Sequence, residues 1–323
     1  MIIFNGCYGS LLEEYLTFKK SLGYSMANRY HWRDIDNFLK DHTASSKTIG
    51  INEYQFSEWY KIRPNETSRN QYERAIRMKS FSCFLLAKGY KSFIPANIKT
   101  YKKEFVPYVF STEEISKLFK AADSMKSKHS NGSKELAPII FRLLYSTGLR
   151  ISELLSLELE HLKLYEEIPH LIITNTKNKQ DRLVVLSNSA LIILQTFLSQ
   201  RSSGQSNFVF ITNKGSSISS GLVYEWFRET IEIAGIHHRG RSYGPCVHSL
   251  RHSFAVHSLY SMSKKGLDLY YCLPILSNFL GHKSIESTDM YVRLTAEIYP
   301  DLLSKMSEIN KLIFPEVSNE KYN

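Results

Sequence analysis

Apolar residues recur every three or four positions over the first ninety residues, which is the spacing of amphipathic helices. The pattern predicts two helices within 8–40, the first ending at Gly23, and a second pair over about 52–60 and 67–88. Gly89 follows the last of these, where a glycine commonly ends a helix. The chain therefore begins with an all-helical unit.

Helical spacing returns after a connecting segment. Ser111 and Glu114 form the pattern of a capping box, which marks a helix start. The helices predicted from there cover about 112–123, 137–147, 188–202 and 219–234, and the spacing stays helical from Pro245 nearly to the end. The second part of the chain is therefore also mostly helical.

Two runs in this second part have the composition of strands. Residues 170–175 (HLIITN) and 182–186 (RLVVL) are rich in β-branched side chains and flank the polar stretch TKNKQD, so they predict a hairpin. FVFIT (208–212) is predicted to be a short third strand. The fold class is thus mainly α, with a small antiparallel sheet in the second domain.

A linker separates the two domains. Residues 91–110 hold two prolines and a Lys-Lys pair, which is typical of an interdomain connection. We expect domains over 1–104 and 105–323, and 323 residues suffice for two buried cores.

Positive charge is concentrated in the first domain. The chain has 41 Lys and Arg against 31 Asp and Glu, a net charge of +10, and residues 1–104 hold 17 basic and 10 acidic residues. Such an excess favours a polyanionic partner. A solvated basic helix face is the alternative. The candidate phosphate-contacting residues are Arg69, Arg74, Arg77, Lys79, Lys102 and Lys103.

Several classes of protein do not fit. No apolar run reaches the ~18–20 residues of a membrane-spanning helix, and the N-terminus lacks the pattern of a signal peptide. The cysteines are scattered, without a CxxC pair, which argues against a disulfide framework or a Cys-based zinc site.

Some polar residues occupy positions that are unfavourable for structure alone. Arg150 follows Gly148 between two apolar helical runs, where an arginine needs an anionic partner. A salt bridge to Glu153 would supply one. His248 and Arg251 share a helix face in HSLRHSFAVHSLY.

Together, four segments carry a family resemblance. TGLRISELLSL, TKNKQDRLVVL, HSLRHSFAVH and LGHKSIESTDMYV occur in the order and spacing of the tyrosine recombinase (phage integrase) family. The chain resembles that family over about 105–300, and especially recombinases carried by bacterial mobile elements. The basic first domain is similar to the family's DNA-clamping, core-binding domain.

The resemblance implies a role for each matching residue. Tyr291 would attack a phosphodiester and form a 3′-phosphotyrosyl link. Arg150 and Arg251 would bind the phosphate oxygens, and Lys177, or Lys179, would protonate the leaving 5′ oxygen. His248 would receive the tyrosine's proton. His282 would donate a hydrogen bond to the phosphate, Glu153 would orient Arg150, and His252 would pack or contact phosphate.

The resemblance also implies partners. It predicts double-stranded DNA recombination sites, a tetrameric synaptic complex and, in some systems, sister recombinases or accessory proteins, with no cofactor, metal or membrane. It places the protein in the bacterial cytoplasm, at the nucleoid. A tail helix over about 300–314 would dock on a neighbouring subunit through its apolar stripe, which comprises Leu302, Leu303, Met306, Ile309 and Ile313.

Other functions share some of these features. A type IB topoisomerase uses the same catalytic set without strand exchange. A zinc hydrolase could use His248, His252 and Cys246, but HSLRH lacks the glutamate of HExxH. A regulator that binds DNA without catalysis is the third alternative, although all six catalytic candidates are present.

Overall fold

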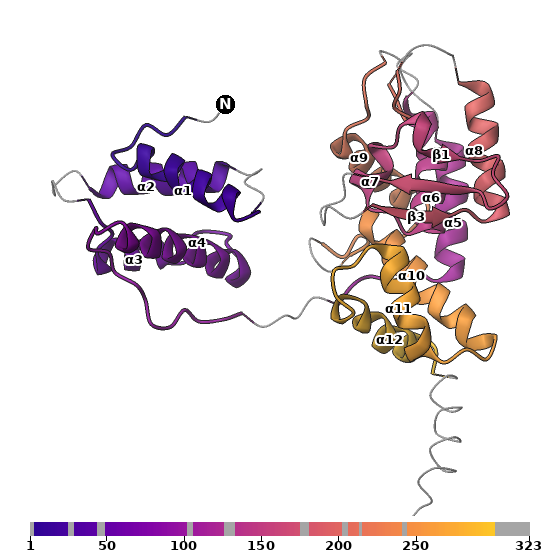
Figure 1. Ribbon diagram of the computed structural model, residues 1–323. Coiled ribbons are helices and arrows are strands. Elements are labelled where there is room, and N and C mark those ends of the chain that lie inside the picture. The colour runs from indigo at the N-terminus through magenta and orange to yellow at the C-terminus, as the bar shows by residue number, and fades with distance from the viewer. Residues whose placement is uncertain are drawn as a thin grey trace, which may run out of the picture. The chain divides into compact units, whose positions relative to one another are not determined.

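The structure is a computed structural model and describes residues 3–24, 29–43, 49–101, 106–125, 133–174, 181–201, 206–212, 215–240 and 244–300. The chain divides into two units, Met1–Glu104 and Phe105–Asn323 (Figure 1). Both units are mainly helical, which confirms the predicted fold class.

The first unit contains α1 (Gly9–Ser21), α2 (Tyr30–His42), α3 (Glu53–Tyr60) and α4 (Ser68–Ala87). Side chains cap two of the helix starts. Asn52 and Gln55 form a capping box before α3, and the hydroxyl of Thr67 accepts the N–H of Asn70 at the start of α4. These caps satisfy backbone N–H groups that have no partner inside the helix.

An aromatic core holds these four helices together. Tyr15 of α1 packs edge-on against Trp32 and Phe81, with ring centroids 5.1 and 5.5 Å apart, and joins α1 to α2 and α4. Burying side chains of this size contributes roughly 1.5–3 kcal/mol each. The first unit therefore has a core of its own.

The second unit begins with α5 (Thr112–Ser124), which has the predicted capping box: Ser111 accepts the N–H of Glu114, and the Glu114 carboxylate accepts the N–H of Ser111. The helices that follow are η1 (Ser133–Leu136), α6 (Ala137–Thr147), α7 (Ile151–Leu155), η2 (Leu159–His161), α8 (Asn188–Gln200), α9 (Ser220–Ile233), α10 (Val247–Lys264), α11 (Leu269–Leu280) and α12 (Glu286–Ile298).

A small antiparallel sheet lies beside these helices (Figure 1). Its order is β1 (Leu162–Lys163), β2 (His170–Ile173), β3 (Arg182–Val185). Ile173 pairs with Arg182, so β2 and β3 form the predicted hairpin.

The third strand is not the one that the sequence predicts. Phe208 and Ile211 each form only an isolated bridge, to Glu158 and Ser217, and the segment adds no strand to the sheet. Its apolar character instead reflects core burial, since Val209 and Phe210 are fully buried. A short apolar run does not distinguish these two cases.

The apolar helix α6 is interrupted by a charge. Arg142 donates two hydrogen bonds to the Asp123 carboxylate of α5, at 2.8 and 2.7 Å. Within the part of the chain that the structure describes, no helix is both long and apolar enough to cross a membrane.

Candidate active site

Arg251 on α10 is a buried cation at the centre of the site. Its guanidinium donates to the carbonyl of Gly148 at 2.7 Å and to that of Leu280 at 2.8 Å, at the C-terminal ends of α6 and α11. Such carbonyls carry partial negative charge, so both helix ends stabilise a cation here. Burial and the nearby charge of Arg150 lower the pKa of Arg251 to about 10, which leaves it charged at neutral pH.

Two glycines allow those helix ends to meet the arginines. Gly148 and Gly281 end α6 and α11 in the left-handed conformation, with φ of 60° and 66°. A Cβ atom at Gly148 would lie 2.5 Å from the Phe254 ring, and one at Gly281 would lie 2.8 Å from the Arg182 guanidinium. Both conformation and space therefore require glycine in the TGLR and LGH segments.

A single carboxylate holds two further arginines in place. Glu153 on α7 pairs with Arg150 at 2.7 Å and with Arg182 at 2.8 Å, so the predicted contact with Arg150 is present. Burial alone would raise the pKa of Glu153, but hydrogen bonds from Arg182 and Arg150 hold it at about 2. The carboxylate is therefore ionised throughout the physiological range.

The cluster has more positive than negative charge. Two guanidinium groups, those of Arg150 and Arg182, pair with the one carboxylate of Glu153, and a third, that of Arg251, interacts with it only electrostatically. The Arg150 side chain is 24% exposed and that of Arg182 is 8% exposed, so Arg150 lies toward solvent. Partly desolvated cations in excess form a site suited to an anion with several oxygens, such as a phosphate.

Three histidines lie next to the arginines. His248 is exposed on α10, and His252 is buried one turn later, with the ring centroids 4.7 Å apart. His282 follows α11, and its Nδ1 lies 2.7 Å from the Thr288 hydroxyl. Loss of hydration, followed by nearby positive charge, lowers the pKa to about 4 for His282 and to about 3 for His252. Both are neutral at pH 7.

Tyr291 of α12 completes the group from within the same unit. Its side chain is 2% exposed, and its hydroxyl lies 2.9 Å from Nδ1 of His252. The His282 ring lies nearly parallel to the phenol ring, with the centroids 6.2 Å apart. Burial raises the pKa of Tyr291, and the positive charge of Arg251 opposes that effect.

The structure therefore brings five of the six predicted catalytic residues together: Arg150, His248, Arg251, His282 and Tyr291. Lys177 and its alternative Lys179 lie outside the described residues. The base of their hairpin, however, adjoins the site, because Arg182 pairs with Ile173 across the hairpin and with Glu153 in the cluster.

Two partners in the site were not identified from the sequence. Arg182 begins a strand in an ordinary-looking position, and nothing local shows that it meets Glu153. Thr288, which holds His282, is three residues before Tyr291 on α12 and therefore shares its helix face. This three-residue spacing from Tyr291 is the sequence feature that could have identified Thr288 as a site residue.

In the first unit, the structure removes Arg74 from the predicted set of DNA-binding residues. Its side chain is 7% exposed and donates to both oxygens of Glu66, at 2.9 and 2.8 Å, and to the carbonyl of Lys61. The Arg74 carbonyl accepts the indole N–H of Trp59. Arg74 is thus a buried structural residue and is not available to a phosphate.

The other basic candidates of this unit lie in different settings. Arg69 and Arg77 both pair with Glu73, and the Arg69 side chain is 65% exposed. Lys79 donates to the carbonyl of Pro95 at 2.9 Å. Lys102 and Lys103 lie outside the described residues.

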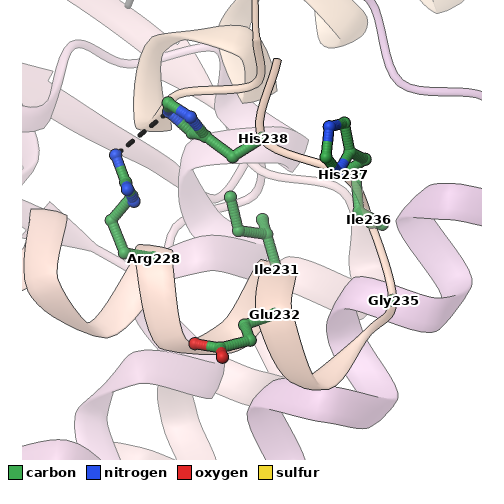
Figure 2. A pocket seen from close by; sticks show the side chains of 7 residues that line it. All are labelled: Arg228, Ile231, Glu232, Gly235, Ile236, His237 and His238. Atoms are coloured by element: carbon green, nitrogen blue, oxygen red, sulfur yellow. Dashed lines mark hydrogen bonds between the residues drawn. The ribbon is translucent and has the colours of Figure 1, made fainter. Parts of the chain in front are cut away.

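A cavity of about 490 Å³ lies elsewhere on the second unit, at the C-terminal end of α9. Figure 2 shows Arg228 and His238 joined across it, 3.1 Å apart, above Glu232. The cavity shares no lining residue with the arginine and histidine cluster, so it is not part of the candidate active site. Within the described ranges, no group of three or more His, Cys, Asp or Glu residues is arranged to hold a metal ion.

Comparisons with known proteins agree with this geometry. Residues 109–297 match the model of the phage integrase family. The tyrosine recombinase XerD of Listeria monocytogenes is 28% identical over 301 residues, which cover 88% of this chain and 94% of that protein. Tyrosine recombinase XerA of Pyrococcus horikoshii is 23% identical over 297 residues, covering 87% and 94% of the two chains.

Solved structures show the same fold. The XerH site-specific recombinase bound to palindromic difH substrate gives a TM-score of 0.64 at 18% identity, over 85% of this chain and 77% of that chain. These relatives are recombinases, which does not favour the topoisomerase alternative. Since the family match spans more than half of the sequence and includes the whole arginine, histidine and tyrosine cluster, the chain belongs to the phage integrase family of tyrosine recombinases.

Proposed function

We propose that this protein is a site-specific DNA recombinase that breaks and rejoins strands through a 3′-phosphotyrosyl intermediate. The observation that carries the proposal is the position of one tyrosine hydroxyl, that of Tyr291, beside arginines that outnumber their carboxylate. Such a cluster complements a phosphodiester as it gains negative charge during substitution. Membership of the family supports the same chemistry.

In this mechanism the arginines bind the scissile phosphate. Arg251, fixed by two carbonyls, and Arg150, fixed by Glu153, would each direct N–H groups at its non-bridging oxygens. Guanidinium groups held in advance stabilise the transition state without reorganising. His282, which Thr288 orients, would donate a further hydrogen bond to the phosphate.

The leaving group needs a proton of its own. We assign this to Lys177, with Lys179 as the alternative, because the hairpin that carries both residues has its base at Arg182, beside the site. An ammonium on a flexible side chain can reach the 5′ oxygen as the phosphorus–oxygen bond breaks. Exchanging each lysine for alanine separately identifies the acid.

The nucleophile must be uncovered before it can attack. At 2% exposure the Tyr291 side chain cannot meet a phosphodiester of double-stranded DNA, so the residues that cover it must move when DNA binds. The protein would therefore remain inert toward DNA until a target site is correctly bound.

The partners follow from the same proposal. The first unit would contact the DNA backbone through Arg69, Arg77, Lys79, Lys102 and Lys103, mainly independently of sequence. The reaction would serve integration, excision or transposition of a mobile element. It would take place in a tetramer on DNA, an arrangement found in a solved lambda integrase complex with a Holliday junction.

The tail hypothesis is tested by truncation after Tyr299. If residues 300–314 dock on a neighbouring subunit, the truncated chain should still bind single sites but fail to assemble the tetramer, as measured by the mass of the DNA-bound complex. Normal assembly of the truncated chain would contradict it.

A trapping assay tests the proposed function as a whole. The protein is incubated in EDTA with nicked DNA that carries the sequence flanking its own gene, and a denaturation-resistant adduct should form. Tyr291→Phe should abolish the adduct, whereas Tyr271→Phe should not, because Tyr271 is an 84% exposed tyrosine of the same unit. Cleavage that EDTA prevents, with no adduct, would overturn the proposal. Relaxation of plasmids that lack the site, without recombinants, would indicate a topoisomerase.

A further inference from the structure

The buried contact between Tyr291 and His252 joins the hydroxyl of the proposed nucleophile to a ring nitrogen. The positive charge of Arg251, the next residue before His252 on α10, favours the ionised form of the Tyr291 hydroxyl. The Tyr291 hydroxyl lies 2.9 Å from Nδ1 of His252, at hydrogen-bond distance. A neutral histidine can accept there when its proton is on Nε2.

The other two histidines of the site are less well placed to take that proton. Nδ1 of His282 is already bonded to the Thr288 hydroxyl, and its ring lies alongside the phenol ring. His248, which the family resemblance suggests for this role, is exposed and contacts the His252 ring, one turn before it on α10. Among the described histidines, His252 is the one at hydrogen-bond distance from the reacting oxygen.

We propose that His252 is the catalytic base that takes the hydroxyl proton of Tyr291, an inference that rests on the proposed recombinase function. As the tyrosine oxygen bonds to phosphorus, its proton moves to Nδ1 of His252. The bond from phosphorus to the 5′ oxygen breaks, and that oxygen takes a proton from the general acid. In the rejoining step a 5′ hydroxyl attacks, the acid regains its proton, and His252 returns its own to the departing phenolate.

The surroundings couple this base to the arrival of the phosphate. The titratable and charged groups that face His252 are His248 and Arg251 on its own helix, His282 after α11 and Tyr291 on α12. Burial and these positive neighbours keep it neutral but weakly basic in the DNA-free protein. A phosphate at Arg251 would offset that charge and make His252 a stronger base as the substrate binds.

The test is single-turnover cleavage by His252→Asn between pH 6.5 and 9. Asparagine keeps a hydrogen-bond acceptor near the Nδ1 position but cannot take up a proton. At pH 7 the rate should fall by about 10²–10⁴-fold. The deficit should then shrink by about tenfold per pH unit, because solvent deprotonates the tyrosine instead. His248→Asn, the same change at the competing candidate one turn away, should show no such recovery.

A modified substrate separates the base from the acid. When sulfur replaces the bridging 5′ oxygen, the leaving thiolate needs no proton, so cleavage by Lys177→Ala should recover while cleavage by His252→Asn should not. Recovery of His252→Asn on this substrate would overturn the inference. So would a rate within threefold of the unmodified protein at pH 7, or a deficit that is the same at every pH.

A measurement on the unmodified side chain covers the case in which His252→Asn does not fold. Nitrogen NMR of labelled histidine should show Nδ1 of His252 unprotonated and accepting a hydrogen bond, and Tyr291→Phe should remove that bond. A protonated Nδ1 would overturn the inference. If the unmodified protein forms an adduct while either result contradicts His252, only this inference fails; if no adduct forms at all, the proposed function fails.

Discussion

Both units of this protein bury arginine side chains, but these arginines have different roles in the two units. In the first, Arg74 donates two hydrogen bonds to its own carboxylate, Glu66, and a third to a backbone carbonyl. In the second, Arg150 and Arg182 share the carboxylate of Glu153, and Arg251 relies on carbonyls at two helix ends. A buried arginine that is matched by a carboxylate stabilises a fold. Arginines in excess of carboxylates form a binding site for an anion.

The largest expected effect is on stability, in the matched pair. Arg74→Ala leaves Glu66 buried without its partner, which should lower the free energy of unfolding of the first unit by about 3–5 kcal/mol. Denaturant titration followed by Trp32 and Trp59 fluorescence measures it. Arg69→Ala, at an exposed pair, should change stability by less than about 1 kcal/mol. If Arg74→Ala and Arg69→Ala lowered stability equally, the structural role given to the buried pair would be contradicted.

The second-largest effect is on catalysis, in the unmatched cluster, that is, the group of Arg150, Arg182 and Arg251 that outnumbers its one carboxylate. Arg251→Lys keeps the charge but loses the paired contacts of a guanidinium, so we expect cleavage to slow by about 10²–10³-fold, or about 3–4 kcal/mol. Single-turnover adduct formation at saturating protein measures it. Arg74→Lys, assayed at a temperature where it is folded, should cleave at the normal rate. A loss for that variant would mean that the first unit also acts in the chemical step.

Acid should weaken the cluster through its one carboxylate. The folded pKa of Glu153, about 2, lies below its ordinary value of 4.5, so its contribution is complete above pH 4.5 and is lost as the pH falls toward 2. A difference of this size corresponds to about 3 kcal/mol. Unfolding titrations across that range should show a smaller loss of stability for Glu153→Gln than for the unmodified protein. If the two proteins lost stability equally as the pH falls, the role given to the ionised Glu153 carboxylate would be contradicted.

The smallest effect concerns anions themselves. Sulfate should stabilise the second unit by filling the unmatched cluster, by about 1.4 kcal/mol at ten times its dissociation constant. Thermal unfolding in sulfate, compared with chloride at equal ionic strength, measures this. The increment should disappear in Arg251→Ala and persist in Arg74→Ala. An increment that survives in Arg251→Ala would come from sulfate acting on the whole surface.

Local sequence patterns predicted the elements that local chemistry determines. The capping box at Ser111 and Glu114 and the hairpin of β2 and β3 are present because turns and caps depend on neighbouring residues. The strand predicted over 208–212 was wrong, because burial in a core produces the same apolar run.

The site was predictable as a set of residues but not as a set of contacts. Helical spacing placed Arg74 with Arg69 and Arg77, and could not show that Glu66, in the segment before α4, would enclose it. Likewise Arg182 meets Glu153 across 29 residues, and His252 meets Tyr291 across 39. Such contacts depend on how helices pack, which residue spacing along one helix does not encode.

The burial of Tyr291 against His252 also sets a thermodynamic limit on the reaction. If the uncovered arrangement of the site is a minor conformation, the observed cleavage rate is the intrinsic rate multiplied by its population. Each 1.4 kcal/mol that stabilises the closed arrangement then lowers unprompted strand breakage tenfold. In the proposed complex, contacts with bound DNA would supply the same free energy to restore it. The packing of one aromatic ring would thus make the rate of strand cleavage depend on DNA binding.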